Sequence, residues 1–405
     1  MEQPTFKVYG YRWVILLVFM LAAAFNQLLW ITFAPITSAA AAYYGVSDLS
    51  IGLLSLSFLV AYLFVSIPAS WLIDTYGFRL AVGIGAALTG VFGLVRGLAG
   101  SNYTLVLIAQ IGIAIGQPFI LNALTKVAAR WFPLQERATA SGLGSLALYV
   151  GILVALVATP FLILQVGIVV TLVIYGAGAL VAGVAFLAAA REHPPTPPGP
   201  PDQEERALMF DGLKQVVRQR DFILLMLIFF IGLGIFNSVT TWIEDIVRPR
   251  GFSVTQAGTA GGLMILGGVI GALLLPSLSD RYRRRVPFIL IALLGAIPGL
   301  AGITFATSQG LLMASAFLFG FFLLSSGPIG FQYGAEIARP TPEGTSNGLL
   351  LLMGQISGIA FILGMDSTRV PSTGSMTPSL IVLIALMLLS VILATQLHES
   401  KLLTK

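Results

Sequence analysis

Two short hydrophilic stretches decide the fold of this chain. They read DTYGFR at residues 74–79 and DRYRRR at residues 280–285, and each lies between two apolar segments. Both place an acidic residue at the end of one apolar segment and basic residues at the start of the next. A repeat of this kind in so apolar a chain indicates two homologous membrane-embedded halves, which is a common plan of solute transporters.

The composition also indicates a membrane protein. Hydrophobic residues make up 57% of the 405 residues and charged residues only 10%, too few to cover a soluble protein of this length. The net charge of +5 is the excess of Lys and Arg that membrane proteins keep on their cytoplasmic side, so we expect no nucleic-acid partner. The chain has no cysteine, which excludes disulfides, thiolate metal sites and cysteine nucleophiles.

The sequence gives no sign of an enzyme. It contains no arrangement of a nucleophile with a base and no cluster of metal-ligand residues. We therefore expect no catalytic residues, no bound metal and no cofactor, and we expect the protein to be a monomer in the lipid bilayer.

Twelve apolar segments are long enough to cross a membrane, because a transmembrane helix needs about 20 apolar residues. The sequence predicts an all-α membrane protein with twelve transmembrane helices in two pseudo-symmetric six-helix bundles. The predicted spans are 13–38, 49–72, 79–99, 105–129, 139–161, 166–190, 222–246, 256–279, 286–306, 311–337, 346–365 and 377–397.

One sizeable hydrophilic break divides the chain. We predict an N-terminal six-helix bundle at 1–190, a Pro-rich cytoplasmic linker at 191–221 and a C-terminal six-helix bundle at 222–405. The linker contains PPTPPGPP at 194–201, which makes a stiff extended spacer, and a short amphipathic helix is expected near 203–219.

The basic residues predict the orientation. With both termini cytoplasmic, all but four of the 22 Lys and Arg fall on the cytoplasmic side, which is the arrangement that membrane insertion favours. The four exceptions are Arg96, Arg248, Arg250 and Arg369. Short loops without cysteine favour a prokaryotic plasma membrane.

Two further landmarks recur at the offset of 206 or 207 residues that separates Asp74 from Asp280. The segment PLQE at 133–136 is followed by SGL at 141–143, and PTPE at 340–343 is followed by NGL at 347–349. The whole chain therefore resembles the major facilitator superfamily, which implies that superfamily's fold. The signature departs from the family at Ser70, Thr75, Phe78 and Pro276, where other small or basic residues are usual.

The repeated loops have two readings. By the resemblance, their charges form a gate that locks the halves in one state and opens in the other. Asp74 is expected to pair with Arg79 or with Arg137 in the first half. The equivalent gating residues in the second half are Asp280, Arg281 and Arg284. The alternative is that these residues only determine topology and cap helices.

A substrate site is expected near the middle of the membrane between the halves, where polar side chains are costly. Asn26, Trp30 and Phe33 share one helix face. The other polar candidates are Gln110 and Gln117 in the fourth span, Phe236, Asn237, Thr241 and Glu244 in or near the seventh, Ser325, Ser326, Gln332, Tyr333 and Glu336 in the tenth, and Gln355 in the eleventh. The alternative role for each is a hydrogen bond between neighbouring helices.

Charged residues are absent from the middle third of every predicted span. A polyanionic substrate would therefore lack a counter-charge, and proton coupling would lack the usual buried carboxylate or histidine. This favours a neutral or cationic solute that moves down its gradient. A tryptophan with glutamines suits a quaternary ammonium ion, since a cation binds an aromatic face and amide oxygens complete its shell.

Several stretches are similar to the feline leukaemia virus subgroup C receptor-related transporters, a family associated with haem, choline and ethanolamine. They are WLIDT at 71–75, QPFIL at 117–121 and EGTSNGLL at 343–350, together with the segment around Trp30. The resemblance implies a choline site formed by Trp30, Gln117 and Gln355. The family has a tyrosine in span 7, where this chain reads FNSV at 236–239. Haem is disfavoured, because neither histidine can reach a central cavity.

Choline or ethanolamine transport is thus the leading hypothesis, with three rivals. A multispecific exporter of amphipathic compounds would use Phe-rich walls and Glu244 or Glu336. An organic-anion carrier would depend on Lys126 or Arg96. A substrate sensor would retain the fold without transporting.

Overall fold

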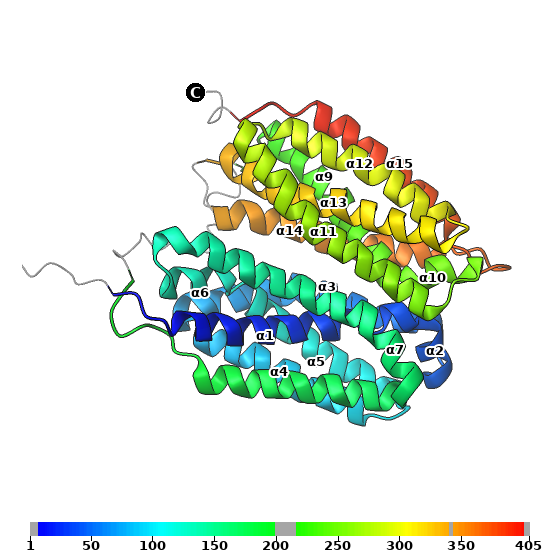
Figure 1. Ribbon diagram of the computed structural model, residues 1–405, viewed down its shortest axis with the longest axis horizontal. Helices are drawn as coiled ribbons and strands as arrows, with labels where there is room; N and C mark the ends of the chain where they lie inside the picture. Colours follow the sequence, from blue (N-terminus) through cyan, green and yellow to red (C-terminus); the bar gives the residue numbers. More distant parts are fainter. Residues whose placement is uncertain (1–6, 199–215, 340–342, 401–405) are drawn as a thin grey trace, which may run out of the picture.

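The computed structural model describes residues 7–198, 216–339 and 343–400 (Figure 1). Within these ranges every regular element is a helix. The first half contains α1 Arg12–Ile31, η1 Ala34–Ile36, α2 Thr37–Tyr44, α3 Asp48–Tyr76, α4 Phe78–Leu98, α5 Tyr103–Leu121, α6 Leu124–Trp131 and α7 Leu134–Ala189. The second half contains α9 Arg220–Thr241, α10 Ile243–Val247, η2 Arg248–Arg250, α11 Val254–Tyr282, α12 Val286–Phe305, α13 Gln309–Ile337, α14 Glu343–Ser367 and α15 Thr377–Thr395.

The expected all-α membrane fold is confirmed. Eleven stretches of the described chain are long and apolar enough to cross a membrane. One of them, Gln135–Ala189, contains two of the twelve predicted spans, because α7 is interrupted at Gly167 with φ 79°. Glycine tolerates this left-handed conformation without a steric penalty, so the chain can turn there and cross the membrane again.

The two halves repeat one another closely. Helices α3 and α11 both contain 29 residues and begin at equivalent caps, where the hydroxyls of Ser47 and Ser253 accept the backbone N–H three residues on. Both helices end in a residue with positive φ, Gly77 at 90° and Arg283 at 51°. These are the turns of the two hydrophilic stretches, so the repeated sequence gives a repeated backbone.

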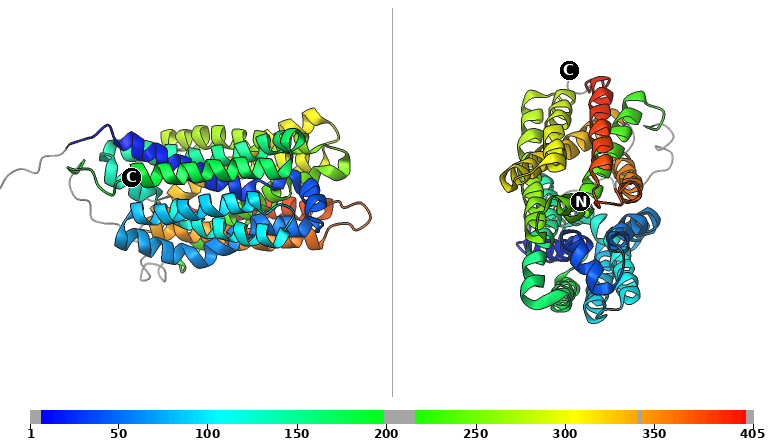
Figure 2. Two further views of the ribbon diagram at one scale, coloured as in Figure 1. Left: turned by 90° about the horizontal axis from the view of Figure 1, so that it is seen from below. Right: turned by 90° about the vertical axis from the view of Figure 1, so that its right-hand side faces the viewer.

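The halves form two layers that pack face to face (Figure 2). The first and last described residues lie at one end of the bundle, which we call the termini end, together with the 74–79 and 280–285 turns (Figure 1). Helices α2 and α10 lie at the opposite end, which we call the far end (Figure 1). The halves contact each other mainly through α7 with α11 and through α3 with α14.

Two equivalent glycines allow close contact between the halves toward the far end. A Cβ atom on Gly52 of α3 would lie 2.5 Å from the Trp242 ring, and one on Gly258 of α11 would lie 2.2 Å from the carbonyl oxygen of Leu156 in α7. Gly52 and Gly258 are 206 residues apart, so the repeat places a glycine at both crossings. A side chain at either position would push the halves apart.

The linker falls largely outside the described residues. Helix α7 ends at Ala189 and α9 begins at Arg220, and the hydroxyl of Tyr9 is hydrogen-bonded to Thr196 of the Pro-rich segment. The amphipathic helix expected near 203–219 lies mostly within residues 199–215, which the structure does not describe.

Candidate functional site

Trp30 lies near the end of α1 and is 6% exposed. Its indole N–H donates to the carbonyl oxygen of Ser55 in α3 at 3.1 Å. This bond uses the only hydrogen-bond donor of the ring. What Trp30 can still offer a ligand is its aromatic face, which attracts a cation.

The side-chain amides of Gln117 and Gln355 have no protein partner in the part of the chain that the structure describes. Gln117 of α5 is 7% exposed and Gln355 of α14 is partly exposed, and neither side chain makes a hydrogen bond to any described residue. Their amide groups are absent from the fully buried atoms that lack a partner, so they retain hydrogen-bonding capacity that is open to a ligand.

Two of the other candidates bridge helices of their own half. Asn26 is fully buried and donates to the Thr89 hydroxyl of α4 at 3.0 Å and to the Ile113 carbonyl of α5 at 3.4 Å. Asn237 donates to the Gly354 carbonyl of α14 at 3.2 Å. The neighbouring Phe236 is partly buried against the main apolar cluster. The two asparagines have the bridging role that was the alternative reading of the sequence.

Two further substrate candidates lie toward the termini end. Tyr333 is fully buried and its hydroxyl donates to the carbonyl of His398 at 2.7 Å. Gln332 is exposed and donates to Glu336 at 3.2 Å. Gln332 also lines a cavity of about 350 Å³ with Asp280 and Arg285. Neither residue is positioned with Trp30.

The charged groups at the termini end pair within each half. In the first half Lys126 of α6 pairs with Asp74 at 3.3 Å, and the Arg137 Nε donates to the Phe132 carbonyl. In the second half Arg285 pairs with Asp280 and, at 2.9 Å, with Glu336 of α13. Burial lowers the pKa of Arg285, but its bonds to Glu336 and Asp280 outweigh burial and raise the pKa above its usual value.

The repeated loops also begin their helices in the same way. Glu192 accepts the backbone N–H of Phe78 and of Arg79 at the start of α4, and Glu399 accepts those of Arg285 and Val286 at the start of α12. A carboxylate at a helix N-terminus is stabilising. The predicted gating residues Arg79, Arg281 and Arg284 thus belong to loops with a clear capping function. Their gating role stays a prediction.

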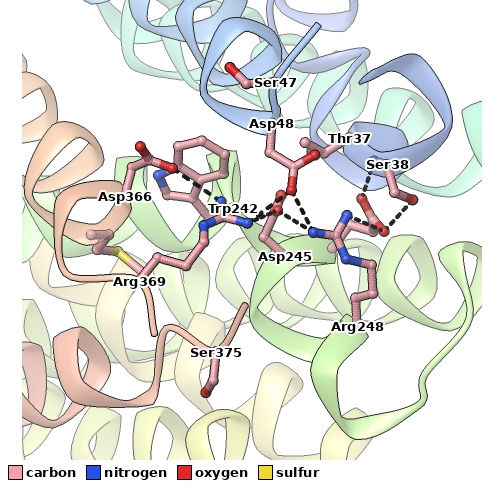
Figure 3. Close-up of polar contacts among 12 residues, drawn as sticks. Thr37, Ser38, Ser47, Asp48, Trp242, Asp245, Arg248, Asp366, Arg369 and Ser375 are labelled. Carbon is pink, nitrogen blue, oxygen red and sulfur yellow. Dashed lines mark hydrogen bonds and ion pairs between the residues drawn. The ribbon is translucent and has the colours of Figure 1, made fainter. Parts of the chain in front are cut away.

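Ion pairs join the two halves at the far end (Figure 3). Asp48 of the first half pairs with Arg248 at 2.6 Å and with Arg369 at 2.9 Å, both from the second half. The same two arginines pair with Asp245. Ser38 donates its backbone N–H and its hydroxyl to Glu244, each at 2.7 Å. The sequence did not identify this cluster. Its acidic and basic residues all lie beside the ends of apolar segments, and that position was the only signal available.

The partners of Arg96 were not predicted from the sequence. The sequence placed it near the non-cytoplasmic end of the third span, and the structure shows it fully buried in the last turn of α4. Its guanidinium donates to the Leu29 carbonyl at 2.8 Å, to the Gln110 side chain at 2.7 Å and to the Thr32 hydroxyl at 3.4 Å. A residue near a span end can turn toward neighbouring helices, and the sequence pattern does not record which groups it then meets.

Two repeated bundles that face each other and are joined by ion pairs at the far end form an architecture common among secondary transporters. The sequence model of the Major Facilitator Superfamily matches residues 16–362. The chain belongs to this superfamily, and within it is related to the choline and ethanolamine transporters FLVCR1 and FLVCR2 and to solute carrier family 49.

The relatives resemble the chain over most of its length. Solute carrier family 49 member A3 of Xenopus tropicalis is 32% identical over 93% of this chain and 82% of its own. The choline/ethanolamine transporter FLVCR1 of Felis catus is 28% identical over 87% of this chain and 67% of its own. The choline/ethanolamine transporter FLVCR2 of Homo sapiens is 25% identical, over 88% and 72%. The predicted relationship to the feline leukaemia virus subgroup C receptor-related transporters is confirmed.

Solved structures share the fold. A bacterial homologue of the human lysosomal transporter Spinster, in an inward-facing and unoccupied conformation, matches with TM-score 0.73 and 17% identity over 96% of both chains. The D-xylose–proton symporter matches with TM-score 0.73 and 17% identity, over 97% of this chain and 99% of its own. At this identity the likeness shows the fold alone.

Proposed function

We propose that this protein moves a small organic ammonium ion, choline or ethanolamine, across the membrane by alternating access. The substrate binds between the halves, with its cationic group against the face of Trp30 and the amides of Gln117 and Gln355 around it. The observation that supports this most strongly is the pair of unpartnered amides, of which Gln117 is 7% exposed. The names of the FLVCR relatives supply the substrate class.

The contacts of the charged residues argue against two of the rivals. Arg96 is enclosed by carbonyl and amide oxygens, so an organic anion cannot reach it. Lys126 is engaged by Asp74 at the termini end. Glu244 is 1% exposed and bound to Ser38, and Glu336 is bound to Arg285. Neither glutamate is free to bind an amphipathic cation, as a multispecific exporter would need.

We further propose that both termini lie in the cytoplasm, because that places most Lys and Arg inside. The far end, closed by ion pairs between the halves, then faces outward. The buried carboxylates of the described chain lie at the two ends of the bundle, which favours gradient-driven transport. The relatives named above are vertebrate proteins, so the expectation of a prokaryotic membrane has no support among them.

Flux measurements in proteoliposomes test the proposal. Wild-type protein should take up radiolabelled choline, with competition by ethanolamine and little competition by tetraphenylphosphonium. Competition by tetraphenylphosphonium as strong as by choline would favour the multispecific exporter. Saturable choline binding without flux would favour a sensor, and absence of both would remove the ammonium assignment.

A further inference from the structure

The end of α1 is held by a buried cation that has no described acidic partner. Arg96 is fully buried, and its described hydrogen-bond acceptors are the neutral oxygens of Leu29, Gln110 and Thr32. Its Nε has no partner among the described residues. A lone buried charge is costly unless it is compensated, so the position of Arg96 requires a physical explanation.

The C-terminus of α1 provides the compensation. The last four carbonyl groups of a helix lack partners within the helix and carry partial negative charge. Arg96 Nη1 donates to the Leu29 carbonyl at 2.8 Å, and Gln110 Nε2 donates to the same oxygen at 3.2 Å and to the Trp30 carbonyl at 3.5 Å. Arg96 also donates to the Gln110 amide oxygen, which orients the amide so that its N–H groups point at α1.

These hydrogen bonds restrain the orientation of Trp30. Its own carbonyl and that of the residue before it are held by α4 and α5, while its indole N–H is held by Ser55 of α3. Helices α5 and α3 therefore bond Trp30 itself, at its backbone and at its ring edge, while α4 bonds the residue before it. The ring face is the part left unbonded.

We propose that Arg96 and Gln110 are positioning residues that set the orientation of Trp30 and thereby the affinity for the ammonium substrate. The link to substrate affinity rests on the proposed function, whereas the positioning of Trp30 by Arg96 and Gln110 does not. A cation–aromatic contact depends on the cation lying over the ring face, so a small rotation of Trp30 weakens it. Arg96 itself does not touch substrate.

The segment that carries Trp30 also reaches the contacts that close the far end. The chain continues from Thr32 through η1 to α2, where Ser38 binds Glu244 of the other half at 2.7 Å. The hydrogen bonds of Arg96 and Gln110 thus hold Trp30 in the segment that also closes the far end. The segment that carries Trp30 therefore continues directly into the segment that contacts the other half at the far end.

Two variants and a matched control separate positioning from simple stability. Gln110→Leu removes the amide that donates to α1, and Arg96→Lys keeps the charge but loses the forked geometry. Thr89→Val is the control, because Thr89 is a buried residue of α4 that accepts a hydrogen bond from Asn26 of α1 but does not contact the end of α1. All three should lower thermal stability.

The readout is 19F NMR of protein labelled with 5-fluorotryptophan, in which the Trp30 resonance is assigned by its loss in Trp30→Phe. We expect Gln110→Leu and Arg96→Lys to shift this resonance and to weaken choline binding about tenfold or more. Thr89→Val should leave the Trp30 resonance in place and the affinity within about twofold. An unshifted Trp30 resonance in both variants would overturn the inference.

The two proposals fail in different ways. If wild-type protein does not bind choline, the proposed function fails, and the 19F shift still decides whether Arg96 and Gln110 position Trp30. If wild-type protein binds choline and both variants bind it equally well, the positioning inference fails and the function stands.

Discussion

The two halves share a backbone and differ in their polar contacts. Toward the termini end of the first half, Asn122 accepts from Tyr62 and donates to the hydroxyls of Ser66 and Ser70, joining α3 to α5. The positions equivalent to Ser70 and Asn122 in the second half are Pro276 and Pro328. These prolines line the cavity of about 350 Å³. A hydrogen-bonded joint in one half thus corresponds to a cavity in the other.

The same asymmetry applies to the binding region. Trp30 corresponds to Phe236, Arg96 to Gly302 and Gln110 to Ala316, each 206 residues on. The second half therefore lacks the buried cation and the amide that hold α1. The repeat specifies where the helices run, whereas the residues that break the repeat determine what each half can bind. Experiments that disturb equivalent positions should therefore have unequal effects.

The largest difference is expected in stability. Arg285→Ala removes a guanidinium whose side chain is 7% exposed and which binds Asp280 and Glu336. Breaking a buried pair of this kind costs about 3–5 kcal/mol, because a buried carboxylate is left unpaired. Lys126→Ala breaks the contact to Asp74, the equivalent of Asp280, whose side chain is 29% exposed, and should cost about 1 kcal/mol. Thermal unfolding in detergent measures both, and equal losses would contradict the comparison.

A smaller effect, on transport, is expected at the equivalent glycines. Gly258→Ala places a methyl group against the Leu156 carbonyl and Gly52→Ala places one against the Trp242 ring. Both should hinder closure of the far end and lower choline flux at least about tenfold, with Gly258→Ala the more severe because a backbone carbonyl cannot move aside. Gly232→Ala is the control, since its nearest neighbour is Leu323 at 3.8 Å. Normal flux in Gly258→Ala would refute this interpretation.

The ion pairs across the far end should shift the conformational equilibrium by a few-fold. Asp48→Asn weakens the contacts to Arg248 and Arg369 and should populate the open far end. The chain has no cysteine, so a single Thr37→Cys reports opening, because Thr37 is 1% exposed. Labelling should be several times faster with Asp48→Asn. Arg250→Ala should change nothing, as Arg250 binds the Ala306 and Ile246 carbonyls within its own half.

The smallest expected effect is a dependence on pH. Burial raises the pKa of Asp245 to about 7, against the opposing influence of Arg369 and Arg248 and with added repulsion from Glu244 and Asp48. An acid with a raised pKa binds its proton more tightly in the closed far end than when exposed, where its pKa is about 4. Closure is therefore favoured as pH falls from about 7 toward 4 and loses this stabilisation as pH rises through 7.

Labelling of Thr37→Cys tests this dependence, after correction for the intrinsic reactivity of the thiol with a free cysteine standard. The corrected rate should fall on acidification from about pH 7.5 to about 5.5. Asp245→Asn should remove the dependence. A pH profile that is the same in Asp245→Asn and in the parent would assign the effect to another group.

The fold could be predicted from sequence because it depends on features that a linear pattern records. Apolar length predicts the spans, and the recurrence of Asp74 at Asp280 predicts the two halves. The partners of buried side chains could not be predicted in the same way. Asn26 and Trp30 share a face of α1, yet Asn26 binds α4 and α5 while Trp30 binds α3.

Arg96 illustrates the same limit for charge. The sequence placed it three residues from the end of a predicted span but gave no indication of the groups that surround it. Arg96 is buried against the end of α1. A carbonyl group of α1 and the amide of Gln110 take the place of an acidic partner. The far-end cluster was missed for a related reason, since Asp48 and Arg369 are 321 residues apart.

Choline binding to purified protein tests the central claim most directly, with Trp30→Ala compared to wild type and Trp71→Ala as the matched control. Trp71 is 59% exposed on α3, so its loss should leave affinity unchanged. A desolvated cation–aromatic contact is worth about 2 kcal/mol, so Trp30→Ala should weaken binding about 30-fold. Saturable wild-type binding that survives in Trp30→Ala, or no binding at millimolar choline, would contradict the assignment of the site.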